Sequence, residues 1–322
     1  MSRIRFYQSV MELFFHTALE WLSEGRRVSW VTVIETKGST PRHPGAMMLV
    51  DESGTLFQTI GGGAVENEVT QIAKDVALSK KKAHIVHRAL GTDLAMCCGG
   101  QMTFLIEPLK PCQSLFMEVQ AALQAGQTLL LRTDLKTYHK TIEQAVSKRD
   151  SEDSFLQVIK PSFRLALFGC GHVGKEIGAL AAKCGFQIVA CDDNHTGELE
   201  QPLPWASKTV ASFEWTDVFA ESHRFSELDM VLIVTRDHEK DERLLKEAMN
   251  FIDSLGYLGL IGSKGKLGRF TKRLKSQGIQ NGWEKLHCPI GLNIGAETPI
   301  EIAVSVMAEL VQVRNRLQQK TA

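Results

Sequence analysis

Residues 164–174 read RLALFGCGHVG, a short apolar segment that leads into three closely spaced glycines. A G-x-G-x-x-G pattern predicts a nucleotide-binding turn when a strand precedes it, a helix follows it, and an acid comes about 20 residues later. Here a helical segment and a second apolar strand at residues 187–191 follow, and Asp192 ends that strand. The sequence therefore predicts a Rossmann-type nucleotide-binding domain in the C-terminal half.

The glycines of this turn have distinct expected roles. Gly169 permits a tight turn, Gly171 lets the backbone approach a pyrophosphate, and Gly174 lets the helix pack closely on the strand. The helix begins near His172 and Val173, where free N–H groups can donate to anionic oxygens. We expect these five residues to contact a phosphate-bearing cofactor; the alternative is a doubly wound domain that uses the turn only for packing.

Residues that directly follow the neighbouring predicted strands are further candidates for ligand contact. Asp192, or alternatively Asp193, would accept hydrogen bonds from ribose hydroxyls. His238 follows the predicted strand at residues 230–234 and would either contact a ligand or serve as a polar loop residue.

A second glycine segment, GSKGK at residues 262–266, also follows an apolar strand. It contains Ser263 and Lys264, and its lysines together with Arg269 could neutralise a phosphate at the carboxyl ends of the strands. A solvated turn at the start of a helix explains the same residues equally well.

The order of predicted elements divides the chain into two domains. Strands and helices alternate in the second half, which implies a parallel sheet, whereas the first half combines hairpin-like strands with separate helices. Residues 147–154 are polar and charged, which marks a linker. We therefore expect an N-terminal α+β domain at residues 1–154 and a Rossmann-like, doubly wound α/β domain at residues 155–322.

Composition restricts the partners. The 322 residues exceed what one hydrophobic core usually serves. The net charge of zero gives no electrostatic footprint for nucleic acid or anionic lipid. No apolar run reaches the roughly 18 residues of a membrane span, and the N-terminus does not read as a signal peptide. Seven scattered cysteines predict reduced thiols, so we expect a cytoplasmic protein.

Three loops of the first half, at residues 38–45, 61–66 and 91–100, contain more glycine than a turn requires. Because each glycine costs backbone entropy on folding, close approach to a ligand would explain them. Adjacent Cys97 and Cys98 lack the C-x-x-C spacing of a zinc site, and a glycine-flanked thiol suits a soft metal or a sulfur atom. The alternative is that both cysteines are small buried residues.

Other polar residues of this half favour structural explanations. Glu66 begins a predicted helix, where its charge could simply favour the helix dipole. His84 and His87 lie three apart on a predicted strand and hence on opposite faces, so they predict no metal site.

These motifs together resemble the XdhC/CoxI family of xanthine dehydrogenase accessory proteins over nearly the whole chain. Besides the glycine turn, the segments that carry the resemblance are GSTPRHPG at 38–45, IGGGAVE at 60–66, residues 90–100 ending in CCGG, and GLNIGAETP at 291–299. The resemblance implies a chaperone, as a homodimer, that binds the molybdenum cofactor in its molybdopterin form while a cysteine desulfurase installs the sulfido ligand. It would then deliver the cofactor to a xanthine dehydrogenase or a related molybdenum hydroxylase, and would itself be an accessory factor instead of an enzyme.

The family's motifs map onto definite positions. Its glycine-acid loop falls on residues 61–66, its cysteine-glycine loop on residues 98–100, and its nucleotide turn on residues 169–174. In the first half, the residues implied to contact the cofactor are Arg42, Gly61, Gly62, Gly63, Glu66, Cys98, Gly99 and Gly100. Cys98 would face the metal. This chain has Met96, Gln101 and Asn293 where the family usually has glutamine, arginine and aspartate.

Two other functions fit part of the same pattern. The glycine turn with Asp192 also fits an oxidoreductase that binds NAD(P). A regulatory nucleotide sensor would need Gly171 and Asp192 but not the thiol loop. In the chaperone interpretation, the turn would hold a phosphate of the cofactor, or a nucleotide, and the thiol loop would meet the molybdenum–sulfur centre.

Overall fold

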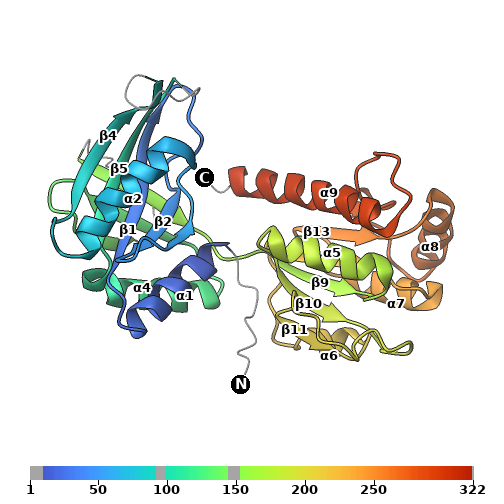
Figure 1. Ribbon diagram of the computed structural model, residues 1–322. Coiled ribbons are helices and arrows are strands. Elements are labelled where there is room, and N and C mark those ends of the chain that lie inside the picture. The colour runs from blue at the N-terminus through green and yellow to red at the C-terminus, as the bar shows by residue number, and fades with distance from the viewer. Residues whose placement is uncertain (1–9, 92–98, 144–152, 321–322) are drawn as a thin grey trace. The chain divides into compact units, whose positions relative to one another are not determined.

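A computed structural model describes residues 10–91, 99–143 and 153–320. The chain divides into two compact units, Met11–Pro161 and a second unit built on Ser162–Ala322. The units share no sheet, as Figure 1 shows. Each unit also has its own hydrophobic cores.

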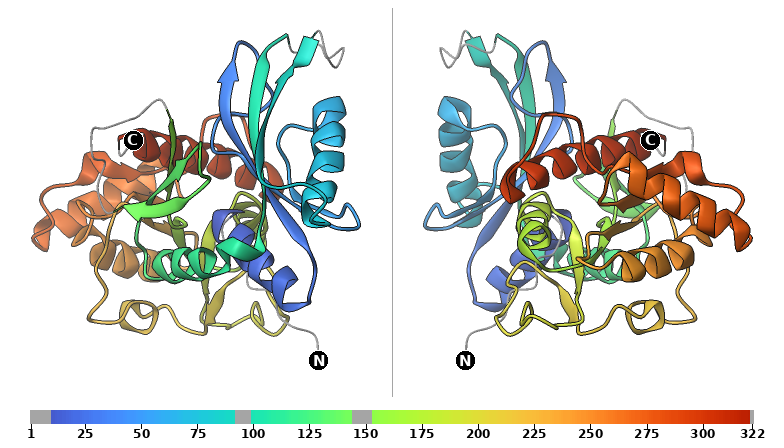
Figure 2. Two further views of the ribbon diagram at one scale, coloured as in Figure 1. Left: turned by 90° about the vertical axis from the view of Figure 1, so that its left-hand side faces the viewer. Right: turned by 90° about the vertical axis from the view of Figure 1, so that its right-hand side faces the viewer.

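The first unit contains a five-stranded antiparallel sheet with the order β3-β2-β1-β5-β4. Its strands are β1 (Val28–Lys37), β2 (Met47–Asp51), β3 (Leu56–Gln58), β4 (His84–Ala89) and β5 (Gln101–Pro108). Helix α2 (Gly63–Ala77) lies along one face of this sheet, in light blue in Figure 2. There Val65 and Val69 share a buried cluster with Val31 and Phe104, so apolar residues spaced one helical turn apart fix this helix on the sheet.

A second core lies on the opposite face of the same sheet. The elements that form it with β1 and β2 are α1 (Val10–Ser23), η1 (Lys110–Cys112), α4 (Gln113–Gln124), β6 (Leu129–Asp134), β7 (Lys140–Glu143) and β8 (Ser154–Ile159). The last three strands form a small antiparallel sheet in the order β7-β6-β8. Trp30 and Phe116 meet edge to face at 4.9 Å in this core, whereas Glu35 and Lys37, further along β1, are exposed.

The second unit is a six-stranded parallel sheet with the order β11-β10-β9-β12-β13-β14. Its strands are β9 (Arg164–Phe168), β10 (Gln187–Cys191), β11 (Lys208–Val210), β12 (Asp229–Ile233), β13 (Tyr257–Leu260) and β14 (Leu286–His287). Counted along the chain, this is the 3-2-1-4-5-6 order of dinucleotide-binding folds. The predicted Rossmann-like α/β fold with an N-terminal α+β part is thus confirmed.

Helices cover both faces of this parallel sheet. They are α5 (His172–Lys183), α6 (Trp215–Val218), α7 (His238–Met249), α8 (Lys264–Ser276), η2 (Trp283–Lys285) and α9 (Pro299–Lys320). Helices α5 and α9 pack side by side on one face, and α7 and α8 pack on the other. At the start of α9 the Glu301 carboxylate accepts from the Thr298 N–H at 2.9 Å and the Glu301 N–H donates to the Thr298 hydroxyl, which is the expected capping box.

Candidate functional site

The glycine turn after β9 has two positions where only glycine fits. Gly169 has a φ of +109°, and a Cβ there would lie 2.5 Å from the carbonyl oxygen of Val234, which follows β12. A Cβ on Gly174 would overlap the carbonyl oxygen of Gly169. These two glycines therefore let the turn pack against the neighbouring strand and against its own helix, as the sequence predicts.

Gly171 is different, because packing does not require it. Its φ of −67° suits any residue, and a Cβ would meet no described atom within 4 Å. It is the N-cap of α5, and no side chain among the described residues caps this helix. His172 is exposed and Val173 half-buried beside it. Gly171 therefore leaves room for a group beside the first turn of α5, and the N–H groups of a first helical turn are typical anion ligands.

Asp192 stabilises the glycine turn through hydrogen bonds to the backbone. Its side chain is buried, and its carboxylate accepts from the Cys170 N–H at 2.7 Å and from the Asn194 N–H at 2.9 Å. Burial raises the pKa of Asp192, although these two hydrogen bonds oppose that shift. Of the two acids considered for a ribose, Asp193 is therefore the accessible one, with 24% of its side chain exposed.

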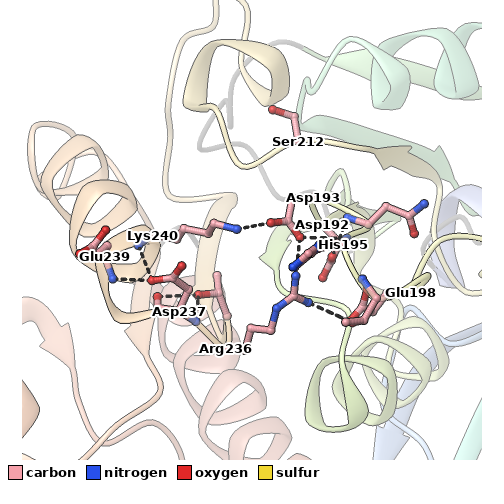
Figure 3. Close-up of polar contacts among 12 residues, drawn as sticks. Asp192, Asp193, His195, Glu198, Ser212, Arg236, Asp237, Glu239 and Lys240 are labelled. Carbon is pink, nitrogen blue, oxygen red and sulfur yellow. Dashed lines mark hydrogen bonds and ion pairs between the residues drawn. The ribbon is translucent and has the colours of Figure 1, made fainter.

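Asp193 belongs to a cluster of ion pairs shown in Figure 3. Arg236 donates to Asp193 at 2.9 Å and to Glu198 at 2.9 Å, and Lys240 also pairs with Asp193. Burial tends to raise the pKa of Asp193, but Lys240 and Arg236 hold it below its usual value. Since Asp193 follows β10 and Arg236 follows β12, the cluster spans the carboxyl end of β9, where the strand order reverses.

The sequence predicted a ligand contact in the loop after β12, but the residue predicted for it was His238 and not Arg236 or Lys240. His238 is exposed at the first residue of α7, and its ring lies 6.5 Å from that of Phe270. Arg236 precedes His238 by two residues, and Lys240 lies about half a helical turn further along α7. Their position directly after a strand is the feature of the sequence that could have identified them.

The second glycine segment proves to be a helix start. Ser263 caps α8, its hydroxyl accepting from the Lys266 N–H at 3.2 Å, and Lys264 is exposed. The expectation that Lys266 neutralises a phosphate is wrong, because its side chain is only 6% exposed. Its ammonium donates to the Ile261 carbonyl at 2.9 Å and pairs with buried Asp241. A phosphate at this edge would find Lys264 and Arg269, but not Lys266.

In the first unit, described residues of the three glycine loops meet at one end of the five-stranded sheet. A Cβ on Gly61 would lie 2.5 Å from the Pro41 side chain, so these two loops touch. The Gly100 N–H donates to the Ser39 carbonyl at 3.1 Å, and Gly99 lies beside Gly91. Some of the glycines therefore serve close packing between loops. Gly62 and Gly99 do not, since a Cβ on either would meet nothing described within 4 Å.

Glu66 holds the loop before α2. Its Oε2 atom accepts from the Thr59 hydroxyl at 2.5 Å, from the Ile60 N–H at 3.0 Å and from the Gly62 N–H at 3.1 Å. These bonds anchor the glycine loop that continues through Gly63 into the helix. Among the other positions implied by the resemblance, Arg42 is exposed, and its carbonyl accepts from the Thr40 hydroxyl at 3.1 Å. Cys97 and Cys98 lie outside the described residues.

Replacing Glu66 by Ala is expected to loosen this loop. Three donors lose their acceptor, so the stability of the first unit should fall by about 1–3 kcal/mol. The amides of Ile60 and Gly62 should then exchange with deuterium roughly tenfold faster than in the wild type. Hydrogen exchange resolved to these amides measures the effect, with Glu68→Ala, on the same helix, as the control. Unchanged exchange at both amides would show that the carboxylate does not anchor the loop.

A polar hollow of about 350 Å³ lies on the sheet beside these loops. Strand pairing places His87, Thr103 and Glu35 in one row across β4, β5 and β1, and Ala89, Gln101 and Lys37 in the next row. All six residues line the hollow. These residues could not be recognised as a site from the sequence, because polar residues at the ends of three strands come together only once the strands are paired.

Metal-ligating side chains are not grouped in the described part of the chain. Within residues 10–91, 99–143 and 153–320, no group of three or more His, Cys, Asp or Glu side chains is arranged to hold a metal ion. Among the described helices, none has both the length and the apolar character needed to cross a membrane.

Comparison with known proteins agrees with this architecture. A family model described as the XdhC and CoxI family matches residues 21–88, and one described as the XdhC Rossmann domain matches residues 165–310. A crystal structure of a xanthine dehydrogenase from Bacillus halodurans superimposes with a TM-score of 0.82 at 25% identity, and the match covers 98% of each chain.

Three relatives extend over most of this chain. An uncharacterised Escherichia coli protein, YqeB, is 30% identical over 88% of this chain, which however spans only 43% of YqeB. A Bacillus subtilis protein named as a probable xanthine dehydrogenase subunit is 26% identical over 94% of this chain and 98% of its own length. The Escherichia coli molybdenum cofactor insertion chaperone PaoD is 25% identical over 92% and 86%, respectively. With both of its units matched by the family's models, this chain belongs to the XdhC and CoxI family.

Proposed function

We propose that this protein carries the molybdenum cofactor, protects it while its sulfido ligand is installed, and inserts it into a xanthine dehydrogenase or a related molybdenum hydroxylase. Family membership supports the accessory role, and similarity to a chaperone named for molybdenum cofactor insertion supports the cargo. The observation that carries the proposal is the open space at Gly171, before an α5 N-terminus that no described side chain caps.

The residues of this turn fit the phosphate end of such a cofactor. The first N–H groups of α5 have no intrahelical partners, and the helix dipole favours an anion there. If the bound ligand includes a nucleotide, Asp193 is the accessible acceptor for ribose hydroxyls, and Arg236 and Lys240 are the cations beside it. The cofactor, when bound, supplies the metal–sulfur chemistry, whereas the protein binds it and shields it.

Taken by itself, the first unit offers its glycine loops as a second candidate contact for the cofactor. Among the described residues, nothing lies within 4 Å of a Cβ built on Gly62 or Gly99, which suits close approach of a ligand to the backbone. A soft thiol at Cys98 suits molybdenum or its sulfur. In this proposal a cysteine desulfurase supplies the sulfur, and the carrier works in the cytoplasm as a homodimer.

Retention of molybdenum tests the carrier role. The purified protein is incubated with isolated molybdenum cofactor, passed through a desalting column, and analysed for co-eluting metal. Gly171→Ala should weaken retention roughly tenfold or more, because the methyl group fills the space for a phosphate, and should cost under about 1 kcal/mol of stability. Gly268→Ala, at an exposed position in α8, should retain cofactor like the wild type. Retention no better than that of an unrelated protein would sink the carrier role.

The same assay examines the thiol. Cys98→Ala should release the sulfurated cofactor more readily than the wild type at an unchanged melting temperature. Equal retention by the two proteins would remove Cys98 from the site while leaving the carrier role in place.

An NAD(P)-dependent oxidoreductase is the second candidate, because the strand order is that of dinucleotide-binding folds. Titration with NADH, followed by fluorescence, separates the two functions. Tight NADH binding accompanied by hydride transfer to an acceptor would replace the carrier proposal.

A further inference from the structure

The polar hollow on the sheet of the first unit has a fixed floor. His87, Thr103 and Glu35 project from three neighbouring strands, and Gln101 and Lys37 project from the next row on the same face. Side chains on paired strands are held more rigidly than side chains on loops. The floor is also the surface of a sheet, so it offers a broad platform on which a planar ring can lie.

Hydrogen bonds orient the first row. The Thr103 hydroxyl donates to Glu35 Oε2 at 3.3 Å, so its oxygen is left to accept from His87 Nδ1, 3.0 Å away. His87 Nε2 then remains as an acceptor. The Glu35 carboxylate takes a second bond from the Lys37 ammonium at 3.1 Å and still has lone pairs to offer, with half of its side chain exposed. Lys37 holds the pKa of Glu35 below its usual range, so this group is a carboxylate at neutral pH.

The charges of the hollow nearly cancel. Glu35 and Lys37 offset each other, and the guanidinium of Arg88 pairs with Glu68. A phosphate would find no net positive charge here, unlike at the N-terminus of α5, and a cation would find no net negative charge. A neutral ligand that is rich in both donors and acceptors fits this balance best.

We propose that this hollow binds the aminopyrimidinone edge of a pterin. The Glu35 carboxylate would accept from the ring's amino group and adjacent N–H, and the Gln101 amide and Lys37 ammonium would donate to its carbonyl oxygen. This inference rests on the proposed function, which makes a pterin cofactor the cargo. Guanine presents the same edge, so the test includes it as a separate arm.

Fluorescence titration with free pterin tests the assignment. Wild-type protein should bind pterin and should bind lumazine, which has oxygen in place of the amino group, much more weakly. Guanosine is titrated in parallel, because guanine presents the same edge. Glu35→Gln should weaken pterin binding roughly tenfold or more, since an amide cannot accept from both donors. It should not weaken lumazine binding, because the new amide can donate to the oxygen that replaces the amino group. Glu118→Gln, at an exposed position in α4, is the matched control and should bind pterin like the wild type.

Three results would overturn the inference. One is no pterin binding by the wild type, a second is equal pterin affinity in Glu35→Gln, and the third is guanosine binding at least as tight as pterin binding. The carrier role has its own readout, because retention of whole cofactor is measured separately. If Glu35→Gln retains molybdenum as fully as the wild type, the hollow does not contribute to cofactor binding, and the proposed carrier role still stands. Pterin binding by a protein that retains no molybdenum would support the hollow as a pterin site and overturn the carrier role.

Discussion

Gly174→Ala is expected to destabilise the Rossmann-like unit by about 3 kcal/mol or more. A Cβ at this position would overlap the Gly169 carbonyl oxygen and lie 2.9 Å from its carbon, and both are backbone atoms that cannot rotate away. Gly169 has little room to shift, since a Cβ built on it would lie 2.5 Å from the Val234 carbonyl oxygen. Urea unfolding followed by tryptophan fluorescence measures the change, because Trp205 packs directly on α5 at Gly178.

Two other glycine variants serve as controls for this experiment. Gly268→Ala, within α8, has open space around it and should raise stability by up to about 1 kcal/mol through helix propensity. Gly171→Ala should change stability little. If Gly174→Ala unfolds at the same urea concentration as these two, the close packing of turn and helix is not as described.

The strand-turn-helix core of the second unit could be read from the sequence because its causes are local. A five-residue apolar strand, three glycines at fixed spacing and a helical pattern each constrain only their neighbours in the chain. The role of Asp192 could not be read in this way. Whether its carboxylate points toward a ribose or toward the Cys170 N–H depends on how the chain turns after β10, which spacing along the sequence does not encode.

The hollow in the first unit was unpredictable for a related reason. A β-bulge interrupts the pairing of β1 with β5 between Val33 and Glu35. Because a shift of one residue moves a side chain to the other face of a strand, this bulge is what places Glu35 opposite Thr103. Without it, Ile34 would take that place and Glu35 would turn to the face covered by α2.

Lys266 shows the opposite case, in which a chemically sensible prediction fails because of burial. A lysine in a glycine-rich turn after a strand resembles a phosphate ligand, but here the side chain is buried and its ammonium pairs with Asp241, which is fully buried. Thr235 donates to the same carboxylate at 2.7 Å. The pair therefore ties α7 to α8, and the charge on each residue is stabilised chiefly by the other.

Breaking this pair is expected to have a large effect on stability. Lys266→Met keeps most of the side-chain volume but leaves the Asp241 charge buried without its partner, and Asp241→Asn strands the ammonium in the same way. Each variant should lose about 3–5 kcal/mol of unfolding free energy, measured by urea denaturation.

The double variant separates an ion pair from two independent contributions. With both charges removed, neither is left buried alone, so Asp241→Asn combined with Lys266→Met should be more stable than the sum of the single losses predicts, by about 2 kcal/mol or more. Simple additivity would mean that the two side chains do not depend on each other. A Lys266→Met protein that is as stable as the wild type but has lost affinity for inorganic phosphate would restore the ligand role that burial argues against.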